Sequence, residues 1–350
     1  MTYLRVEKAG SLSSIQDIGR LGLQRFGITQ SGPMDRFSYE VAHRLVGNSP
    51  DEALIEFVGI GGSYYLSNDA ERAVCCAVTA GDFPVLLNNQ PQGTWQSFLL
   101  CPGDLLEIGY GHQGNYGYLA VQGGIQTPPV LGSRSTHTRA EFGGIDGRLI
   151  AAGDCLPLDF STAQPHTPMC FPKTQRPTQR AIIRVIMGQQ ARMFSADEQK
   201  KFLNQNYKIS NRADRMGVHL EGDPLQHIDG HDVVSDGIVM GSIQVPGTGH
   251  PIVLMADRQP TGGYPKIATI VTADLPTFAQ FRPGQEFQFC SVPVDEARNA
   301  LRAMHKTLST CETLFEPVPQ ENWRSSEFLL SQNLVGGAIA CGDHLPWLKH

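Results

Sequence analysis

Residues 255–269 read MADRQPTGGYPKIAT, and they place charged, amide and glycine residues between two apolar runs. The runs on either side, PIVLMA and IATIVTADL, have the composition of buried strands. A carboxylate such as Asp257 accepts hydrogen bonds from N–H donors, whereas Arg258 and Lys266 can hold a carboxylate or a phosphate. Rigid strands on both sides would direct these groups into a cleft. We therefore predict Asp257, Arg258 and Lys266 as catalytic residues.

The residues between these charges add further polar groups to the same stretch. Two adjacent glycines can expose backbone N–H groups to a developing oxyanion. We predict that this group binds substrate; it consists of Gln259, Thr261, Gly262, Gly263 and Tyr264. The alternative interpretation is structural, with Asp257 and Arg258 forming an internal ion pair that holds the mouth of a barrel.

Other stretches combine Asp, Arg and Gly in the same way. SIQDIGRLGLQRFGITQSGPMD contains Asp17 and Arg20, and VSDGIVMGSIQVPG contains Asp236. GSRSTHTRAEFGGIDGRLIAAGD and NRADRMGVHLEG are similar. Turn chemistry and surface ion pairs, each worth under ~1 kcal/mol, would explain any one of them. Because glycines let a backbone approach a ligand closely, several such clusters also indicate binding. Asp17, Arg20 and Asp236 are additional candidates for the substrate site.

Several familiar catalytic motifs are absent. GYGHQG, at 109–114, matches G-x-G-x-x-G, but the strand-like NYGYLAVQGG follows it, so a hairpin turn is favoured over a phosphate loop. There is no Walker sequence and no G-x-S-x-G elbow. His227 and His231 have no third ligand nearby, so no metal site is predicted. Without a biotin attachment tripeptide, the chain is not expected to carry its own biotin.

The composition is that of an ordinary soluble globular protein. The 350 residues are 41% hydrophobic and 18% charged, with a formal net charge of −6. No block of Lys or Arg stands out, so binding to nucleic acid or to an anionic membrane is not expected. The sequence shows no signal-peptide core and no apolar run of membrane-spanning length. The eight cysteines are scattered without a C-x-x-C, which favours free thiols and a cytoplasmic location.

Short strands bounded by Gly, Asp or Pro predict a mainly β protein built from barrels or sandwiches. Only a few helices are predicted, in MDRFSYEVAHRLVGN, SADEQKKFL and VPVDEARNALRAMHKTL. The polar, proline-rich segment 161–180 cannot continue a helix or a central strand. It predicts a boundary between two domains. The last ~40 residues predict an extension of the chain.

Together, SSIQDIGRLGLQRFGITQSGPMD, SRSTHTRAEFGGIDGR, DRMGVHLEG and SDGIVMGSIQVPG…PIVLMADRQPTGGYPKIAT resemble the allophanate hydrolase subunit 2 family. This family is also called biotin-dependent carboxyltransferase-like, and it includes the C subunits of 5-oxoprolinases. The likeness runs from about residue 3 to about 308. It implies two cyclophilin-like β-barrel domains with a few short helices. We place the N-terminal barrel at 1–165, the C-terminal barrel at 180–308 and the extension at 309–350.

The resemblance also implies a function. Members act in an ATP-dependent 5-oxoprolinase, which opens 5-oxoproline to glutamate with an allophanate hydrolase subunit 1-like partner and often a third subunit. The ATP site is not located by the sequence. One alternative is a carboxyltransferase-type subunit that acts on urea or a related amide, with biotin on another chain. Another is a regulatory protein that binds an inhibitor of a sensor kinase. Since no complete catalytic set is visible, the chain alone is expected to be inactive.

The substrates that the resemblance implies are amides or lactams, which offer N–H donors and a carbonyl acceptor. Asp257 would accept from the amide N–H. Arg258 and Lys266 would hold a carboxylate, the oxygens of carboxybiotin or a phosphate.

Overall fold

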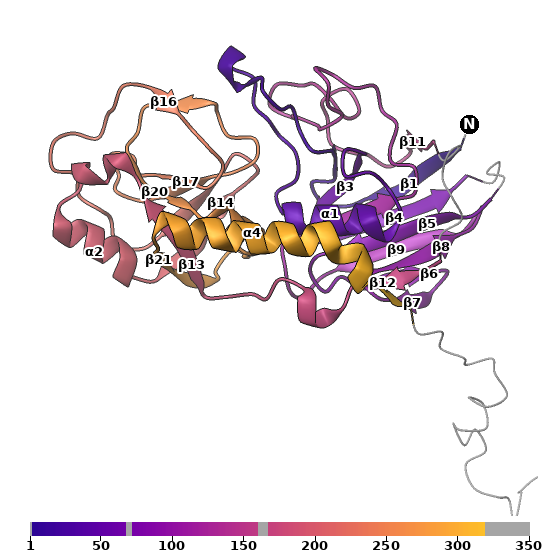
Figure 1. The fold of residues 1–350 in the computed structure, drawn as a ribbon. Coiled ribbons are helices and arrows are strands. Elements are labelled where there is room, and N and C mark those ends of the chain that lie inside the picture. Colours follow the sequence, from indigo (N-terminus) through magenta and orange to yellow (C-terminus); the bar gives the residue numbers. More distant parts are fainter. Residues whose placement is uncertain (1, 68–71, 160–166, 319–350) are drawn as a thin grey trace, which may run out of the picture. The chain divides into compact units, whose positions relative to one another are not determined.

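A computed structural model describes residues 2–67, 72–159 and 167–318 (Figure 1). Its helices and strands all lie in one compact unit, Met1–Pro317. Strands predominate and the helices are few, which confirms the predicted mainly β fold. The two halves of the unit differ, because the N-terminal half is built on two sheets and the C-terminal half on a closed barrel.

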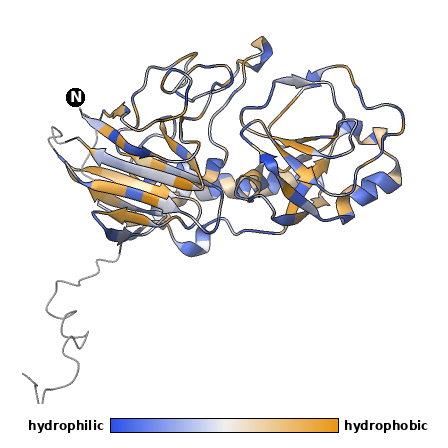
Figure 2. Ribbon diagram, turned by 180° about the vertical axis from the view of Figure 1, so that it is seen from behind, coloured by the Kyte–Doolittle hydropathy of each residue, from blue (hydrophilic) through white to orange (hydrophobic). Residues whose placement is uncertain are grey.

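Antiparallel strands form both sheets of the N-terminal half, where the resemblance predicts the first barrel. The six-stranded sheet has the order β11-β1-β4-β9-β6-β7, formed by Cys155–Pro157, Tyr3–Ala9, Ile60–Leu66, Leu105–Tyr110, Val85–Leu87 and Gln90–Gln92. The seven-stranded sheet has the order β2-β3-β10-β5-β8-β12-β22, formed by Ser14–Gln16, Leu54–Val58, Tyr116–Val121, Val74–Thr79, Gln96–Leu100, Met169–Cys170 and Glu316–Pro317. Every residue of β5 and β10 is buried, which accounts for their continuous apolar sequences. Figure 2 shows the apolar residues concentrated in the strands.

The GYGHQG stretch is not the hairpin turn that its sequence predicts. It connects β9 to β10, which belong to different sheets and do not pair with each other. The loop is held from the other half of the unit, since Arg282 Nε donates to Gly114 O at 2.6 Å and Gln280 Oε1 accepts from Tyr116 N at 3.1 Å. The sequence of two strands joined by a glycine-rich loop does not determine whether the strands pair with each other. Their pairing depends on strands that are distant in sequence. The strand predicted after the loop is confirmed, since it forms β10.

Seven strands close the barrel of the C-terminal half in the order β13-β20-β17-β18-β15-β14-β21. They are Ile182–Met187, Lys266–Ile270, Ser242–Gln244, Ile252–Leu254, Gly217–Glu221, Tyr207–Ala213 and Glu286–Ser291. Aromatic side chains fill one part of its core, where Phe202 stacks on Phe289 with ring centroids 4.9 Å apart. Two short strands, β16 (Asp236–Gly237) and β19 (Thr261–Gly262), pair outside the barrel wall.

The helices lie where the sequence predicts most of them. They are α1 (Arg36–Leu45), α2 (Ala196–Asn204), α3 (Leu275–Ala279) and α4 (Val294–Thr310), of which only the short α3 is not predicted. Asp35 caps α1 by accepting from Ser38 N at 3.0 Å, and Ser195 caps α2 by accepting from Glu198 N at 3.2 Å. Short 3₁₀ turns are η1 (Gln24–Phe26), η2 (Lys173–Gln175), η3 (Gln189–Met193), η4 (Thr272–Asp274) and η5 (Cys311–Leu314).

The segments predicted as a boundary and as an extension are described in part. Of 161–180, the structure describes only the residues from 167, where β12 and η2 precede the barrel. Of 309–350, the first residues complete α4, η5 and β22, and β22 pairs with β12. Residues 319–350 lie outside the described part. Among the described residues no helix is both long and apolar enough to cross a membrane.

The cysteines lead to a first prediction. Seven of them are described, all as free thiols; Cys75, Cys76 and Cys311 are buried, and Cys101, Cys155 and Cys290 are exposed. Burial raises the pKa of Cys75 and of Cys311 to about 11, so little reactive thiolate forms there. In the folded protein a thiol reagent should modify the three exposed cysteines and spare the three buried ones. Mass spectrometry of labelled peptides, before and after unfolding, checks this. A peptide pair joined by a disulfide would contradict it.

Candidate functional site

The stretch 255–266 begins where a barrel strand ends. β18 stops at Leu254, Asp257 and Arg258 follow it, and Lys266 is the first residue of β20. Both charged residues after β18 are buried, with 6% and 5% of their surfaces exposed. The two apolar runs form strands, as the sequence predicts. Both strands belong to the barrel, and they place the charged residues at one end of it.

Asp257 forms an ion pair with Arg215 rather than with its neighbour Arg258. Arg215 Nε lies 2.8 Å from Asp257 Oδ2, and Arg215 Nη2 lies 3.0 Å from Oδ1. The same guanidinium donates to a carboxylate oxygen of Glu56, in the N-terminal half, and to Gly32 O at 2.7 Å. Burial lowers the pKa of Arg215, but Asp257 and Glu56 raise it by more, so the net shift is upward. The guanidinium thus stays charged and joins the two halves.

Arg258 has no such partner. Within the described residues it makes no ion pair, and its side chain donates to two backbone carbonyls, Met255 O at 3.2 Å and Ile238 O at 3.4 Å. Burial lowers the pKa of Arg258 to about 10, against a partly opposing effect of Asp257. A buried guanidinium without a carboxylate is costly, which points to an anion that is supplied from outside the chain.

A cavity of about 590 Å³, the barrel-mouth cavity, opens at this end of the barrel. Five of the predicted residues line it, namely Arg258, Gln259, Gly262, Gly263 and Tyr264. Strands β14, β15, β17 and β18 supply further lining residues, and Arg139 reaches it from the N-terminal half. The cavity is within the usual size range for small-molecule sites.

Three predicted residues of the stretch do not line the cavity, namely Asp257, Thr261 and Lys266. Lys266 Nζ binds Asp236 Oδ2 at 2.6 Å and Gly237 O at 2.8 Å. The hydrogen bond from Lys266 lowers the pKa of the exposed Asp236. Thr261 is in β19, which pairs with β16. Lys266, predicted to be catalytic, and Asp236, predicted to bind substrate, therefore form an ion pair with each other.

Asp17 and Arg20 form a separate cluster with the loop 130–142 of the N-terminal half. Asp17 accepts from Ser135 Oγ at 2.6 Å, and also from Ser133 Oγ and Arg134 N. Arg20 Nη2 donates to Ser135 O at 2.7 Å, and its guanidinium lies 4.5 Å from the centre of the Phe142 ring. Neither residue lines the barrel-mouth cavity.

Several residues of the site escape prediction from sequence. The sequence marks four of them, Arg139, Arg212, Asp214 and Arg215, as charged members of Asp–Arg–Gly clusters, but it does not select them as site residues. Nothing in the sequence indicates that Gln244 belongs to the site. It lines the cavity, is 6% exposed, and its amide nitrogen has no hydrogen-bond partner in the described part of the chain.

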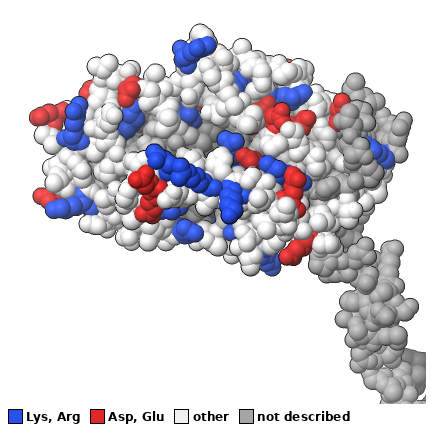
Figure 3. Space-filling view, in the orientation of Figure 1, with Lys and Arg blue, Asp and Glu red and all other residues white. Residues whose placement is uncertain are grey.

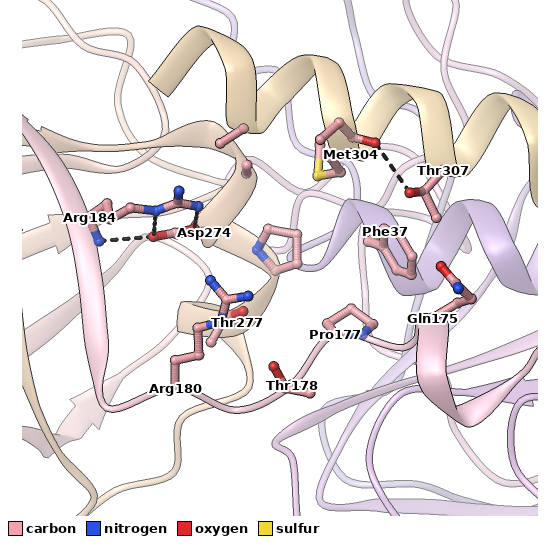
Figure 4. A pocket seen from close by; sticks show the side chains of 14 residues that line it. Phe37, Gln175, Pro177, Thr178, Arg180, Arg184, Asp274, Thr277, Met304 and Thr307 are labelled. Carbon is pink, nitrogen blue, oxygen red and sulfur yellow. Dashed lines mark hydrogen bonds and ion pairs between the residues drawn. The ribbon is translucent and has the colours of Figure 1, made fainter. Parts of the chain in front are cut away.

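A second cavity, of about 320 Å³, lies beneath α4 and contains none of the predicted residues (Figure 4). Arg184 and Asp274 face each other on one side, with Arg184 Nη2 2.6 Å from Asp274 Oδ1. Phe37 and Met304 give the other side an apolar surface. The ion pair there is complete, and Arg180 adds a further guanidinium to the lining of this cavity. On the face shown in Figure 3, basic and acidic side chains are interspersed.

The sequence and fold have clear relatives. Residues 26–291 match the family described as carboxyltransferase domain, subdomain A and B, and the chain belongs to this family. It is 35% identical to the C subunit of the Haemophilus influenzae 5-oxoprolinase over 83% of this chain and 92% of that protein. It is 33% identical to the C subunit of the Escherichia coli 5-oxoprolinase over 85% and 94%. The crystal structure of K. lactis urea amidolyase superposes with a TM-score of 0.82 and 27% identity, covering 88% of this chain and 20% of that one. The resemblance stated from the sequence is confirmed.

Proposed function

We propose that the chain is the C subunit of an ATP-dependent 5-oxoprolinase, which opens 5-oxoproline to glutamate. It would act with an allophanate hydrolase subunit 1-like partner. The observation that carries the proposal is the 35% identity to a 5-oxoprolinase C subunit over 92% of that protein's length. The match spans nearly the whole of that C subunit, whereas the chain covers 20% of the urea amidolyase chain.

In this proposal the barrel-mouth cavity holds the lactam. Arg258 supplies a positive charge that no described carboxylate neutralises by an ion pair. The backbone of Gly262 and Gly263, at the cavity wall, suits a carbonyl oxygen that gains negative charge. Asp257 does not line the cavity, and Arg215 binds both of its oxygens. We therefore assign Asp257 a positioning role at the end of β18, where it fixes the backbone that carries Arg258.

A prediction about the assembly follows. The described residues that line the barrel-mouth cavity include neither a phosphate loop nor a complete set of catalytic groups, so the purified chain alone should not convert 5-oxoproline measurably. Addition of the subunit 1-like protein, and of a third 5-oxoprolinase subunit if one is required, should produce glutamate and ADP in equal amounts. A coupled assay for both products checks this. Full turnover by the isolated, homogeneous chain would contradict the proposed division of labour.

The second candidate function is carboxyl transfer to urea or a related amide, with biotin carried by another chain. The superposition on urea amidolyase favours it, with a TM-score of 0.82. The two candidates differ in their requirements, because only carboxyl transfer needs biotin. Avidin should therefore abolish activity in the second case and leave 5-oxoprolinase turnover unchanged.

A further inference from the structure

The charge of the barrel-mouth cavity indicates what kind of ligand it accepts. Three arginines line it, Arg139, Arg212 and Arg258, and Asp214 is the one acidic residue among the described lining residues. Asp214 Oδ1 is already occupied, since it accepts from Met216 N at 2.7 Å and from Gly217 N at 3.0 Å. The cavity therefore has an excess of positive charge that no ion pair within the described part of the chain neutralises.

None of the three arginines has an ion-pair partner within the described residues. Arg139 contacts the sulfur of Met216 across the cavity rim. The Arg212 side chain is exposed, and its charge lies close enough to His219 to affect that ring. The pKa of His219 is lowered, mainly by burial and to a smaller extent by the charge of Arg212. This lining residue is therefore neutral near pH 7. The positive charge of the cavity thus belongs to the guanidinium groups, whose planar donors bind carboxylates bidentately.

A second unpartnered group complements the arginines. The Gln244 side chain on β17 is buried, lines the same cavity, and leaves its amide nitrogen without a described partner. An unsatisfied buried amide is unfavourable, so the site gains when a ligand carbonyl accepts from it. The cavity thus offers donors for two distinct ligand groups, a carbonyl at Gln244 and an anion at the arginines.

The loop that carries Arg139 is held firmly in place. His137 and Phe142 bridge its base, their rings stack with centroids 5.4 Å apart, and Ala140 N donates to His137 Nδ1 at 3.0 Å. Arg20 and Asp17 bind the preceding part of the loop, as described above. These two residues therefore contribute to the cavity indirectly, by positioning Arg139.

We propose that Arg139, Arg212 and Arg258 form a carboxylate-binding site, which together with Gln244 makes the cavity selective for an acid-bearing lactam over a neutral amide. The inference rests on the proposed function, and it deepens that function by assigning the ligand's two polar groups to specific residues. In 5-oxoproline the carboxylate lies beside the ring nitrogen, and the lactam carbonyl lies on the other side of it. Urea, which has no charge, would leave all three guanidinium groups unpaired.

The test compares ligands that differ by one group. Binding of 5-oxoproline and of 2-pyrrolidinone, the same ring without the carboxylate, is measured by calorimetry on the full chain and on its reconstituted complex. Arg139→Gln and Arg212→Gln should each weaken 5-oxoproline binding about tenfold, and leave 2-pyrrolidinone binding unchanged. Gln244→Met should weaken both. Arg298→Gln is the matched control, because Arg298 lies on α4 and pairs with Asp295 away from the cavity, so it should change neither.

Three results would overturn the inference: no detectable 5-oxoproline binding to the unmodified chain or complex, equal losses for both ligands in the arginine variants, or arginine variants that lose ATP binding alone. The last result would assign the positive charge to a phosphate. Failure of the proposed function is distinguishable. If 5-oxoproline binds in an arginine-dependent way but the complete complex does not hydrolyse it, the carboxylate-binding site stands and the 5-oxoprolinase assignment falls.

Discussion

Replacing Arg215 by methionine is expected to lower the free energy of unfolding by about 3–5 kcal/mol. The side chain is 17% exposed and neutralises two carboxylates that are more deeply buried, Glu56 at 2% and Asp257 at 7%. Methionine fills a similar volume, so the loss comes from two uncompensated charges and not from a cavity. Chemical denaturation of the full chain measures the change.

This loss should depend on pH, in a direction set by Glu56. Burial raises the pKa of Glu56 even though Arg215 partly opposes the shift. Without Arg215 that pKa rises further above its value in the unfolded chain. At low pH, Glu56 in the folded variant takes up a proton, which offsets part of the loss in unfolding free energy. This offset disappears as the pH rises through the raised pKa of Glu56. The destabilisation should therefore be greatest near neutrality and smaller in mildly acidic buffer.

Two further variants test whether the loss of stability comes from the buried carboxylates that Arg215 neutralises. Arg148→Met removes a guanidinium that is also bidentate, to Asp154, but is 46% exposed, so it should cost under about 1 kcal/mol. Asp257→Asn leaves Glu56 to neutralise Arg215 and should cost less than Arg215→Met. If Arg215→Met were no more destabilising than Arg148→Met, the network would not hold the two halves together.

The chemistry of the opening stretch is predictable because it is local. Arg258, Gln259, Gly262, Gly263 and Tyr264 reach one cavity because they are nearly consecutive in the segment that leaves β18 and returns as β20. Apolar composition on either side identifies both strands without any knowledge of their neighbours. The turn residues between them can then only lie at one end of the barrel.

The partners of these residues are not predictable in this way. Adjacency in sequence favours an Asp257–Arg258 pair, whereas the partner of Asp257 comes from another part of the barrel and carries a second bond to Glu56 in β3. Which guanidinium reaches a buried carboxylate depends on how distant strands are placed. The same applies to GYGHQG, whose flanking strands join different sheets. Local pattern thus indicates where charge accumulates, and tertiary packing decides which charge is neutralised and which remains available to a ligand.

Arg258 is the buried one of the three cavity arginines, and its replacement should lower activity without lowering stability. Arg258→Gln should lower the kcat/KM of the reconstituted complex for 5-oxoproline by about tenfold to a hundredfold, because it removes a charge-assisted hydrogen bond to the carboxylate of the substrate. Stability should stay the same or rise, because no described carboxylate forms an ion pair with Arg258 and burial already lowers its pKa to about 10. Steady-state kinetics and thermal unfolding of the same preparations measure the two effects.

Arg215 and Arg258 are expected to respond to replacement in opposite ways. Both lie at the same end of the barrel, yet Arg215 pairs with two carboxylates, whereas the partners of Arg258 among the described residues are carbonyl oxygens. Arg258→Lys keeps the charge without the planar donors, and should recover part of the kcat/KM that Arg258→Gln loses. If Arg258→Gln unfolds the protein, the prediction is wrong. The guanidinium then stabilises the fold through its hydrogen bonds to the two backbone carbonyls. If it folds normally and keeps the original kcat/KM for 5-oxoproline, the charge at the barrel mouth serves another ligand.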